Sequence, residues 1–428
     1  MQSGDDDAIW LMQGWLFTYD PFWEPPQMKA LLHSVPVGRM IVLDLYAEVK
    51  PVWINSDQFY GVPYIWCMLH NFAADFEMYG VLDAVASGPI DARLSENSTM
   101  VGVGMSMEGI EQNPIVYDLM SEMAFHHRQV DLQVWVETYP TRRYGKSVMG
   151  LQDAWRILHQ TLYNCTDGKN DKNRDVIVAF PDVEPFVIQT PGFYTGTSKI
   201  SSAMSSKNYV VKDASNDAYE QPHIWYDLVD LTRQALAKYA NQIFLKIIQS
   251  YKSNNISQVT TLSERFLNLV NDLDMLLASH EGFLLGPWLE SAKGLARDQE
   301  QEKQYEWNAR TQITMWFDNT ETKASLLRDY ANKYWSGLLR DYYGPRAAIY
   351  FKYLILSLEK NEPFALEEWR REWISLTNNW QSDRKVFPTT ATGDALHISR
   401  SLYVKYLLEA GSLQVEDLDG LFRMPASL

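Results

Sequence analysis

The sequence predicts an α/β region followed by a large all-α region, and two observations carry this prediction. Through the first hundred or so residues, short apolar runs alternate with helical segments, a pattern typical of βα units around a parallel sheet. From about residue 114 onward the signals are helical. We expect the α/β domain in residues 1–128 and the all-α domain in residues 129–428.

Four β-rich apolar runs justify the α/β domain. They are Ile9–Met12, Met40–Tyr46, Tyr64–Leu69 and Thr99–Met105. Helical signals lie between them, one at Pro25–Leu32, where prolines mark the entry, and one around residues 78–85. Continuously apolar strands of this kind predict a parallel sheet that is buried on both faces.

Four βα units make half of a (β/α)8 barrel, which needs eight strands and about 250 residues. An open half leaves the edges of its first and last strands unpaired and exposes apolar surface. We therefore expect that further strands belong upstream of Met1.

The all-α domain is predicted from amphipathic periodicity. Apolar residues at spacings of three and four form a stripe along residues 259–276, namely Val259, Leu262, Phe266, Leu269, Leu273 and Leu276. The same periodicity occurs along residues 228–239 and near residues 320–343, 346–360 and 396–409. Each of these segments is expected to be a helix.

Composition excludes several classes of protein. The chain carries 54 acidic and 38 basic side chains, a net charge of −16, which would repel nucleic acid over most of the surface. Cys67 and Cys165 are the two cysteines, so neither a disulfide framework nor a cysteine-rich metal site is expected. No metal, other cofactor, signal peptide or membrane span is predicted. The 15 Trp, 24 Tyr and 17 Phe suit a pocket for sugar rings, although helical cores also use many aromatic residues.

In a parallel barrel, the residues that do chemistry follow the carboxyl ends of the strands. The residues in those positions are Gln13, Gly14 and Trp15; Asp44, Leu45 and Glu48; Trp66, Leu69, His70, Asn71 and Phe72; and Glu108. Carboxylates, aromatic rings and hydrogen-bond donors are what a pocket needs to bind a sugar and cleave its acetal linkage. Glu108 is the strongest candidate for a catalytic carboxylate. The alternative is that it stabilises the dipole of the next helix.

These residues also carry a resemblance to a known family. Trp15-Leu16-Phe17, residues 42–45, 65–72 and 97–102, and Glu108-Gly109-Ile110 resemble glycoside hydrolase family 89, the α-N-acetylglucosaminidases. Helical blocks at residues 226–234, 283–290 and 329–333 are similar as well. The resemblance runs from near residue 8 to about residue 350 and is faint beyond it.

The resemblance implies a retaining glycosidase that removes terminal α-linked N-acetylglucosamine, with this chain holding the carboxyl-terminal half of the catalytic barrel and the helical domain. The glutamate that matches Glu108 is the nucleophile of the family. The pocket walls of the family match Trp15, Leu45, Leu69 and Phe72 in the barrel and Trp316, Leu327 and Tyr330 in the helical domain. His70 is a further candidate for binding substrate because it directly follows the third strand. Phe76 stands where the family has a pocket histidine.

One catalytic group of the family has no counterpart in this sequence. Its general acid/base is a glutamate on an earlier barrel strand, which would lie upstream of Met1. Because retaining hydrolysis needs two carboxyl groups, we expect the chain alone to be inactive or nearly so. The alternative is a non-catalytic helical module that binds a partner or a glycan without cleaving it.

The resemblance also suggests where the full-length enzyme acts. It implies a lysosomal, vacuolar or secreted glycoprotein, and Asn97, Asn164 and Asn255 begin the sequons that could carry glycans. Without a signal peptide, the 428-residue product itself would stay in the cytosol. The expected partner is a glycan that ends in α-linked N-acetylglucosamine, and self-association of the full-length enzyme is left open.

Overall fold

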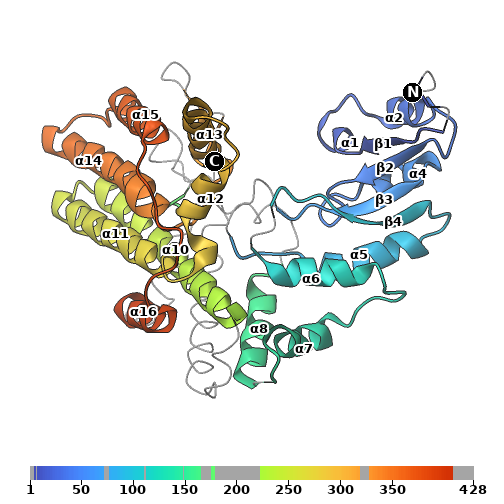
Figure 1. Cartoon of the computed structure of the whole chain (residues 1–428), viewed down its shortest axis with the longest axis horizontal. Coiled ribbons are helices and arrows are strands. Elements are labelled where there is room, and N and C mark those ends of the chain that lie inside the picture. Colours follow the sequence, from blue (N-terminus) through green and yellow to red (C-terminus); the bar gives the residue numbers. More distant parts are fainter. Residues whose placement is uncertain are drawn as a thin grey trace. The chain divides into compact units, whose positions relative to one another are not determined.

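The computed structural model describes residues 4–5, 7–71, 77–109, 112–147, 149–164, 175–178, 222–318 and 327–407. The chain forms two compact units. Their helices and strands are labelled in Figure 1. The sheet unit comprises Met1–Ala74, Met78–Tyr139 and Leu158–Lys172. The helical unit comprises Asp75–Glu77, Pro140–Ile157 and Asn173–Leu428. The units therefore interleave along the chain, whereas we expected a single division after residue 128.

Four parallel strands form the sheet, and their order in space equals their order in sequence. They are β1 (Trp10–Gln13), β2 (Met40–Asp44), β3 (Tyr64–Met68) and β4 (Met100–Met105). Leu43 pairs with Gln13 on one side and with Ile65 on the other, and Ile65 pairs with Gly102. The four strands predicted from the sequence are confirmed, each within two residues of its predicted ends.

One face of the sheet is buried under helices. Val42, Tyr64 and Trp66 point to this face and are at most 1% exposed. The Tyr64 ring stacks on Trp53, at a centroid distance of 6.5 Å. Gly88 approaches Trp66 so closely that a Cβ there would lie 2.8 Å from the indole ring. Helices therefore pack closely against the sheet on this side.

The opposite face is partly exposed, which corrects the prediction that both faces are buried. Strand alternation places Leu11, Ile41, Leu43 and Ile65 on this face, and all four are exposed or half-buried. Leu11 is 58% exposed. In a closed barrel this face would be the interior.

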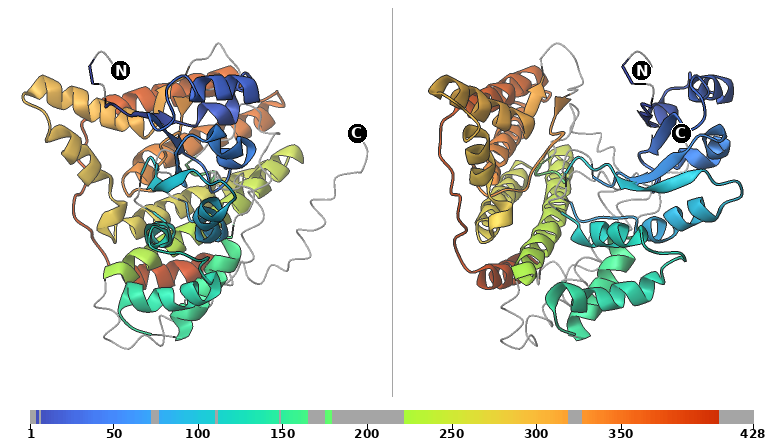
Figure 2. Two further views of the ribbon diagram at one scale, coloured as in Figure 1. Left: turned by 90° about the vertical axis from the view of Figure 1, so that its right-hand side faces the viewer. Right: turned by 45° about the vertical axis from the view of Figure 1, so that its right-hand side comes forward.

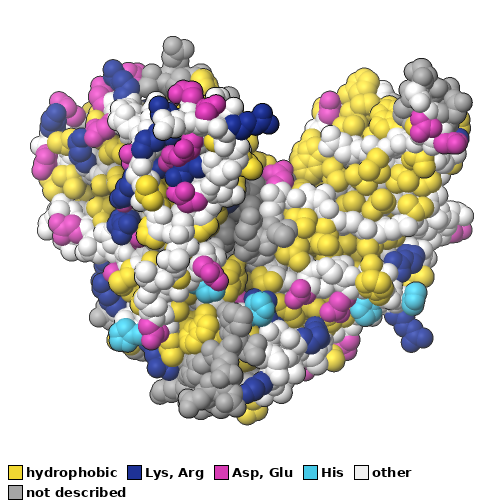
Figure 3. Space-filling view, viewed as in Figure 1, with side chains coloured by type: hydrophobic (Ala, Val, Ile, Leu, Met, Phe, Trp, Pro, Cys, Tyr) yellow, Lys and Arg dark blue, Asp and Glu magenta, His cyan; other side chains and the backbone are white. Residues whose placement is uncertain are grey.

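The first and last strands expose apolar side chains as well. β1 and β4 each pair with a neighbour on one side within the described part of the chain. Val101 is 60% and Met105 44% exposed, and hydrophobic side chains gather over the strands in the space-filling view (Figure 3). Unpaired apolar edges of this kind are what the half-barrel prediction expected.

The other elements of the sheet unit are helical. They are α1 (Leu16–Tyr19), α2 (Pro25–Leu32), α3 (Val52–Asn55), α4 (Asp57–Tyr60), α5 (Leu82–Leu94), α6 (Pro114–Met123), and parts of α7 (Leu132–Tyr144) and α8 (Met149–Thr161). α2 begins and ends as predicted, and α5 packs against β3 and β4.

The helical unit is built around two long helices that pack along each other, α10 (Pro222–Lys252) and α11 (Ile256–Leu277). Figure 2 shows how further helices surround this pair. These elements are η4 (Glu281–Phe283), α12 (Leu285–Lys293), α13 (Gln299–Gln312), η5 (Leu339–Tyr343), α14 (Gly344–Lys360), α15 (Leu366–Ser382), α16 (Ala395–Leu402) and η6 (Tyr403–Leu407). The predicted helices at residues 228–239, 259–276 and 346–360 are confirmed.

The prediction of one helix near residues 320–343 is wrong for the residues described. Leu327–Arg328 form strand β6, which pairs antiparallel with β5 (Met315–Phe317). Helical structure resumes only at η5. Asp329 and Gly337 have φ values of +54° and +92°, which interrupt a helix. Apolar spacing could not reveal these backbone reversals.

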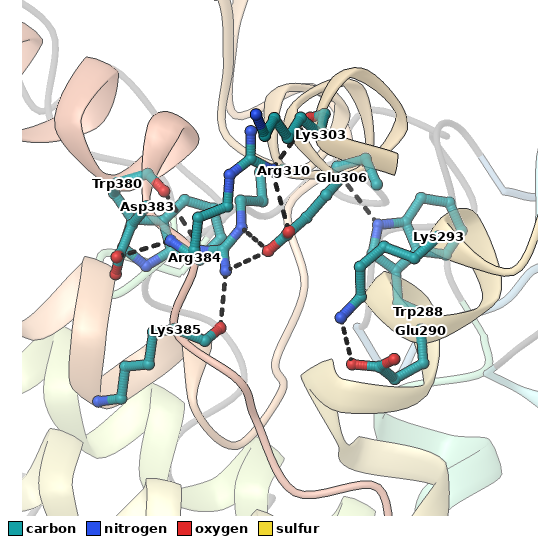
Figure 4. A network of polar contacts seen from close by, with 11 residues as sticks. Trp288, Glu290, Lys293, Lys303, Glu306, Arg310, Trp380, Asp383, Arg384 and Lys385 are labelled. Carbon is teal, nitrogen blue, oxygen red and sulfur yellow. Dashed lines mark hydrogen bonds and ion pairs between the residues drawn. The ribbon is translucent and has the colours of Figure 1, made fainter. Parts of the chain in front are cut away.

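Arg310 on α13 forms hydrogen bonds with the end of α15 and with the chain that follows it (Figure 4). Its fully buried guanidinium donates to Glu306 Oε1 at 2.7 Å, to the Lys385 carbonyl at 2.9 Å and to the Trp380 carbonyl at 3.3 Å. Arg384 donates to the other oxygen of Glu306 at 3.1 Å. Since β5 begins three residues after α13 ends, this network also supports the start of the hairpin.

Among the helices that the structure describes, none is both long and apolar enough to cross a membrane.

Candidate active site

The carboxyl ends of the four strands meet at one edge of the sheet, where backbone hydrogen bonds tie their loops together. The Gly14 N–H donates to the Leu43 carbonyl at 2.7 Å, and the Ser106 N–H donates to the Met68 carbonyl at 2.9 Å. The Ser106 hydroxyl also donates to the Leu45 carbonyl at 3.0 Å. A Cβ at Gly14 would lie 2.9 Å from the Leu43 oxygen, so glycine permits this close approach. Residues predicted from four separate segments thus share one edge.

Glu108 lies in the loop after β4 with an exposed side chain. Its N–H donates to the Asn71 carbonyl at 3.1 Å, which links it to the loop after β3. The alternative role for Glu108, as an acid that stabilises a helix dipole, fits the structure poorly. α6 starts at Pro114 after Asn113, and the dipole effect falls off within the first turn.

Glu48 supports the loop after β3. Its carboxylate is 6% exposed, and its Oε1 accepts the N–H of His70 at 2.6 Å and the N–H of Leu69 at 3.0 Å. His70 has a φ of +53°, a left-handed conformation that is uncommon for a residue with a Cβ. The two hydrogen bonds to Glu48 stabilise this conformation.

The His70 side chain is buried among aromatic rings. It is 3% exposed, and its ring centroid lies 4.6 Å from Tyr79 and 5.5 Å from Tyr117. The Tyr79 hydroxyl donates to the His70 carbonyl. Burial lowers the pKa of His70 to about 3, so the imidazole is uncharged at neutral pH. Within the described residues its Nε2 atom has no hydrogen-bond partner.

The other predicted wall residues of the sheet unit lie near this edge. Trp15 is half-buried, and its ring lies 6.0 Å from Tyr46 and 4.7 Å from Tyr19. Leu45 is half-buried, whereas Leu69 is 6% exposed. Phe72 and Phe76 lie outside the described residues.

Asp44 and Cys67 also lie on these strands, but their environments favour structural roles. The Asp44 carboxylate is 1% exposed and accepts the N–H groups of Val52 and Trp53 at 3.3 and 3.1 Å. Burial raises the pKa of Asp44 to about 7, against the opposing effect of these two donors. Burial, with the nearby charges of Asp44 and Glu48, raises the pKa of Cys67 to about 12. The thiol is therefore neutral and a poor nucleophile.

The three wall residues predicted in the helical unit lie together on the β5–β6 hairpin and its end. Trp316 and Leu327 are 48% and 43% exposed. The Trp316 and Tyr330 rings meet edge to face at a centroid distance of 5.4 Å. The Trp316 indole N–H donates to the Gln312 carbonyl at 3.0 Å, which sets the orientation of the ring. This cluster presents aromatic surface of the kind that packs on a sugar ring.

Buried ion pairs hold both strands of the hairpin. Asp318, directly after β5, accepts from Arg370 at 2.8 Å. Asp329, directly after β6, accepts from Arg346 at 2.6 Å, and both side chains of this second pair are at most 3% exposed. Apolar periodicity does not reveal these supporting residues. The signal in the sequence is that Asp329 begins the block at residues 329–333 that resembles the family, while its partner lies 17 residues further along the chain.

The three predicted glycan acceptors lie at the surface. Asn97 and Asn255 are exposed, and the Asn255 side chain accepts the Gln258 N–H at the start of α11 at 3.1 Å. Asn164 is exposed as well, while the other two residues of its sequon lie outside the described residues. Over the part of the chain that can be described, no three His, Cys, Asp or Glu side chains gather as metal ligands do.

Comparison with known proteins identifies the family. The model of the α-N-acetylglucosaminidase (NAGLU) tim-barrel domain matches residues 1–127, and that of the NAGLU C-terminal domain matches residues 135–405. Human alpha-N-acetylglucosaminidase is 36% identical over 410 residues, which cover 95% of this chain and 53% of the human protein.

Solved structures agree with this relationship. The Family 89 glycoside hydrolase from Clostridium perfringens in complex with PUGNAc has a TM-score of 0.79 and 27% identity, covering 98% of this chain and 46% of the other. A variant of that enzyme in complex with its substrate GlcNAc-alpha-1,4-galactose has a TM-score of 0.81 and 26% identity, with the same coverage. The chain thus spans about half the length of these relatives. It belongs to the α-N-acetylglucosaminidases of glycoside hydrolase family 89, a family of glycosidases with a (β/α)8 barrel and a helical carboxyl-terminal domain.

Proposed function

We propose that this chain carries the nucleophile-bearing half of a retaining glycosidase that removes terminal α-linked N-acetylglucosamine from glycans. The observation that carries the proposal is the position of Glu108, exposed at the carboxyl edge of a parallel sheet and tied to the loop after β3. A nucleophilic carboxylate needs this exposure to reach the anomeric carbon of a sugar.

Residues that would contact the sugar are assigned separately in each unit, on the family resemblance. In the sheet unit they are Trp15, Leu45, Leu69, His70 and Phe72. In the helical unit they are Trp316, Leu327 and Tyr330. Apolar and aromatic side chains pack on the apolar face of a sugar, and the relative in complex with GlcNAc-alpha-1,4-galactose supports this class of substrate.

A retaining mechanism needs a second carboxyl group about 5–5.5 Å from the first. Asp44 and Glu48 are buried and engaged by backbone N–H groups, which leaves Glu108 as the exposed carboxylate among the described strand-end candidates. We assign the general acid/base to an earlier barrel strand of the family's enzymes, within the part of the human relative that this chain does not cover. Loss of a general acid typically costs about 10²–10⁴-fold in rate, so the chain alone should turn over natural glycans very slowly.

The destination of the full-length enzyme is part of the same proposal. A lysosomal, vacuolar or secreted location, which the family resemblance implies, is supported by the exposed sequon asparagines Asn97 and Asn255.

The nucleophile can be tested without the general acid. N-acetyl-α-D-glucosaminyl fluoride has a leaving group that departs as fluoride without being protonated. Attack by a Glu108 carboxylate oxygen forms the C1–O bond while the C1–F bond breaks, and the covalent sugar ester is detected by mass spectrometry. We expect labelling of the wild-type chain at Glu108, slow release of the sugar, and no labelling of Glu108→Gln.

The matched control is Glu96→Gln, which changes an exposed glutamate located before β4 rather than after it. This variant should label like the wild type. An adduct on another residue, or labelling that persists in Glu108→Gln, would refute the assignment. A wild-type chain that binds 2-acetamido-1,2-dideoxynojirimycin but is never labelled would instead favour the non-catalytic binding module.

A further inference from the structure

Glu48 is a buried carboxylate that the proposed chemistry does not use. It follows β2, is 6% exposed, and accepts hydrogen bonds from the backbone of the loop after β3. Its Oε1 lies 2.6 Å from the His70 nitrogen and 3.0 Å from the Leu69 nitrogen, and Oε2 lies 3.2 Å from the Leu69 nitrogen. A buried carboxylate is costly unless it is satisfied in this way.

The backbone segment that donates hydrogen bonds to Glu48 is strained. His70 has a φ of +53°, and the Asn71 N–H turns back to the Leu69 carbonyl at 2.5 Å. A residue with a Cβ keeps a left-handed conformation only when its surroundings impose it. The N–H groups of Leu69 and His70 converge on one carboxylate, which is an interaction of that kind.

This turn also determines where the Asn71 carbonyl points. That oxygen accepts the Glu108 N–H at 3.1 Å. A continuous path of hydrogen bonds therefore runs from the Glu48 carboxylate through the backbone of residues 69–71 to the backbone of Glu108. The path joins segments that follow three different strands.

We propose that Glu48 is a positioning residue that places Glu108. Its carboxylate holds the turn at residues 69–71, and the turn presents the Asn71 carbonyl that fixes the loop of Glu108. The proposal rests on the role of Glu108 in the proposed function, and it extends that role to a residue that touches neither the sugar nor the reacting atoms.

The test measures hydrogen exchange of single backbone amides in the full chain, by mass spectrometry with electron-transfer fragmentation. In Glu48→Gln, which keeps one acceptor oxygen but loses the charge, exchange of the Leu69, His70 and Glu108 amides should accelerate about tenfold or more. Glu48→Ala, which removes every acceptor, should accelerate it further. The partial rescue by glutamine separates lost hydrogen bonds from lost volume, and Glu48→Gln alone remains informative if the alanine variant does not fold.

The matched control is Asp44→Asn. Asp44 is also a buried carboxylate at this edge that accepts two backbone N–H groups, those of Val52 and Trp53. Its replacement should leave exchange at Glu108 within about twofold of the wild type, and amides within α5 should stay protected in all variants. The proposal fails if Glu48→Gln leaves the Glu108 amide unchanged, or if Asp44→Asn accelerates it equally.

Labelling by the glycosyl fluoride supplies the functional measurement. Glu48→Gln should lower the maximal labelling rate about tenfold or more, while the half-saturating concentration of fluoride changes less than about threefold. If the wild type is not labelled at all, the proposed function fails, whereas the exchange measurement still decides whether Glu48 positions the Glu108 loop.

Discussion

Asn71 accepts the backbone N–H of Glu108 at an N···O distance of 3.1 Å, although the two residues follow different strands of the sheet. Because the Asn71 turn is itself held by Glu48, the position of Glu108 depends on the loops after β2, β3 and β4 together. A glutamate on an isolated loop would sample many positions. The proposed nucleophile is instead held by hydrogen bonds to the neighbouring loop.

Asp44 makes the stability of the sheet unit depend on pH. Its pKa is about 7 in the folded chain because of burial, against about 3.9 in an unfolded chain. Between about pH 4 and pH 7, Asp44 therefore binds more protons in the folded state than in the unfolded state. This contribution to stability is fully present below about pH 4 and is lost as the pH rises through about 7, by at most about 4 kcal/mol.

We expect Asp44→Asn to remove that pH dependence. The free energy of unfolding is measured by urea unfolding with tryptophan fluorescence at pH 5 and pH 8. The difference in this free energy between wild type and variant is compared at the two pH values. His70 acts in the opposite direction, because its pKa is lowered to about 3, but it is present in both proteins and cancels in the difference. Equal pH dependence of both proteins would show that Asp44 is ionised in the folded chain throughout.

The Arg346–Asp329 pair should be important for the helical unit. Arg346→Met leaves a carboxylate that is 3% exposed without its 2.6 Å partner, which typically costs about 3–5 kcal/mol. Adding Asp329→Asn should recover most of the loss, since asparagine tolerates the left-handed conformation at this position. A double-mutant cycle by urea unfolding measures the coupling.

The control for this cycle is the pair Arg156–Asp153, which has a similar distance of 2.8 Å but side chains that are 50% and 51% exposed. Arg156→Met should cost less than about 1 kcal/mol. If the two arginine variants lose similar stability, the buried pair does not support the hairpin as we describe.

Two arginines that share Glu306 provide a further comparison. Arg310 is fully buried and donates to two backbone carbonyls as well as to Glu306, whereas the Arg384 side chain is 45% exposed. Arg310→Met should destabilise the helical unit by about 3 kcal/mol or more, and Arg384→Met by less than about 1 kcal/mol. Thermal unfolding by circular dichroism ranks them, and the reverse order would contradict the network in Figure 4.

Much of the fold was predictable because its signals are local. The strands around Val42 and Trp66 are recognisable as continuous apolar runs, and the stripe from Val259 to Leu276 predicts α11 by spacing alone. The prediction of a helix near residues 320–343 was wrong. Apolar spacing indicates neither the left-handed conformation of Asp329 nor the pairing of β5 with β6.

The sequence by itself determined the βα and helical regions, the four strand segments and the candidates at their carboxyl ends, since each follows from neighbouring residues. Only the tertiary structure decided what those candidates contact. In the folded chain, Asp44 accepts a hydrogen bond from the start of α3, Glu48 accepts one from the turn at His70, and Arg346 donates one to Asp329. These interactions join residues that lie 8, 22 and 17 positions apart in the sequence, and they depend on burial. The contacts and the burial arise only when the chain folds.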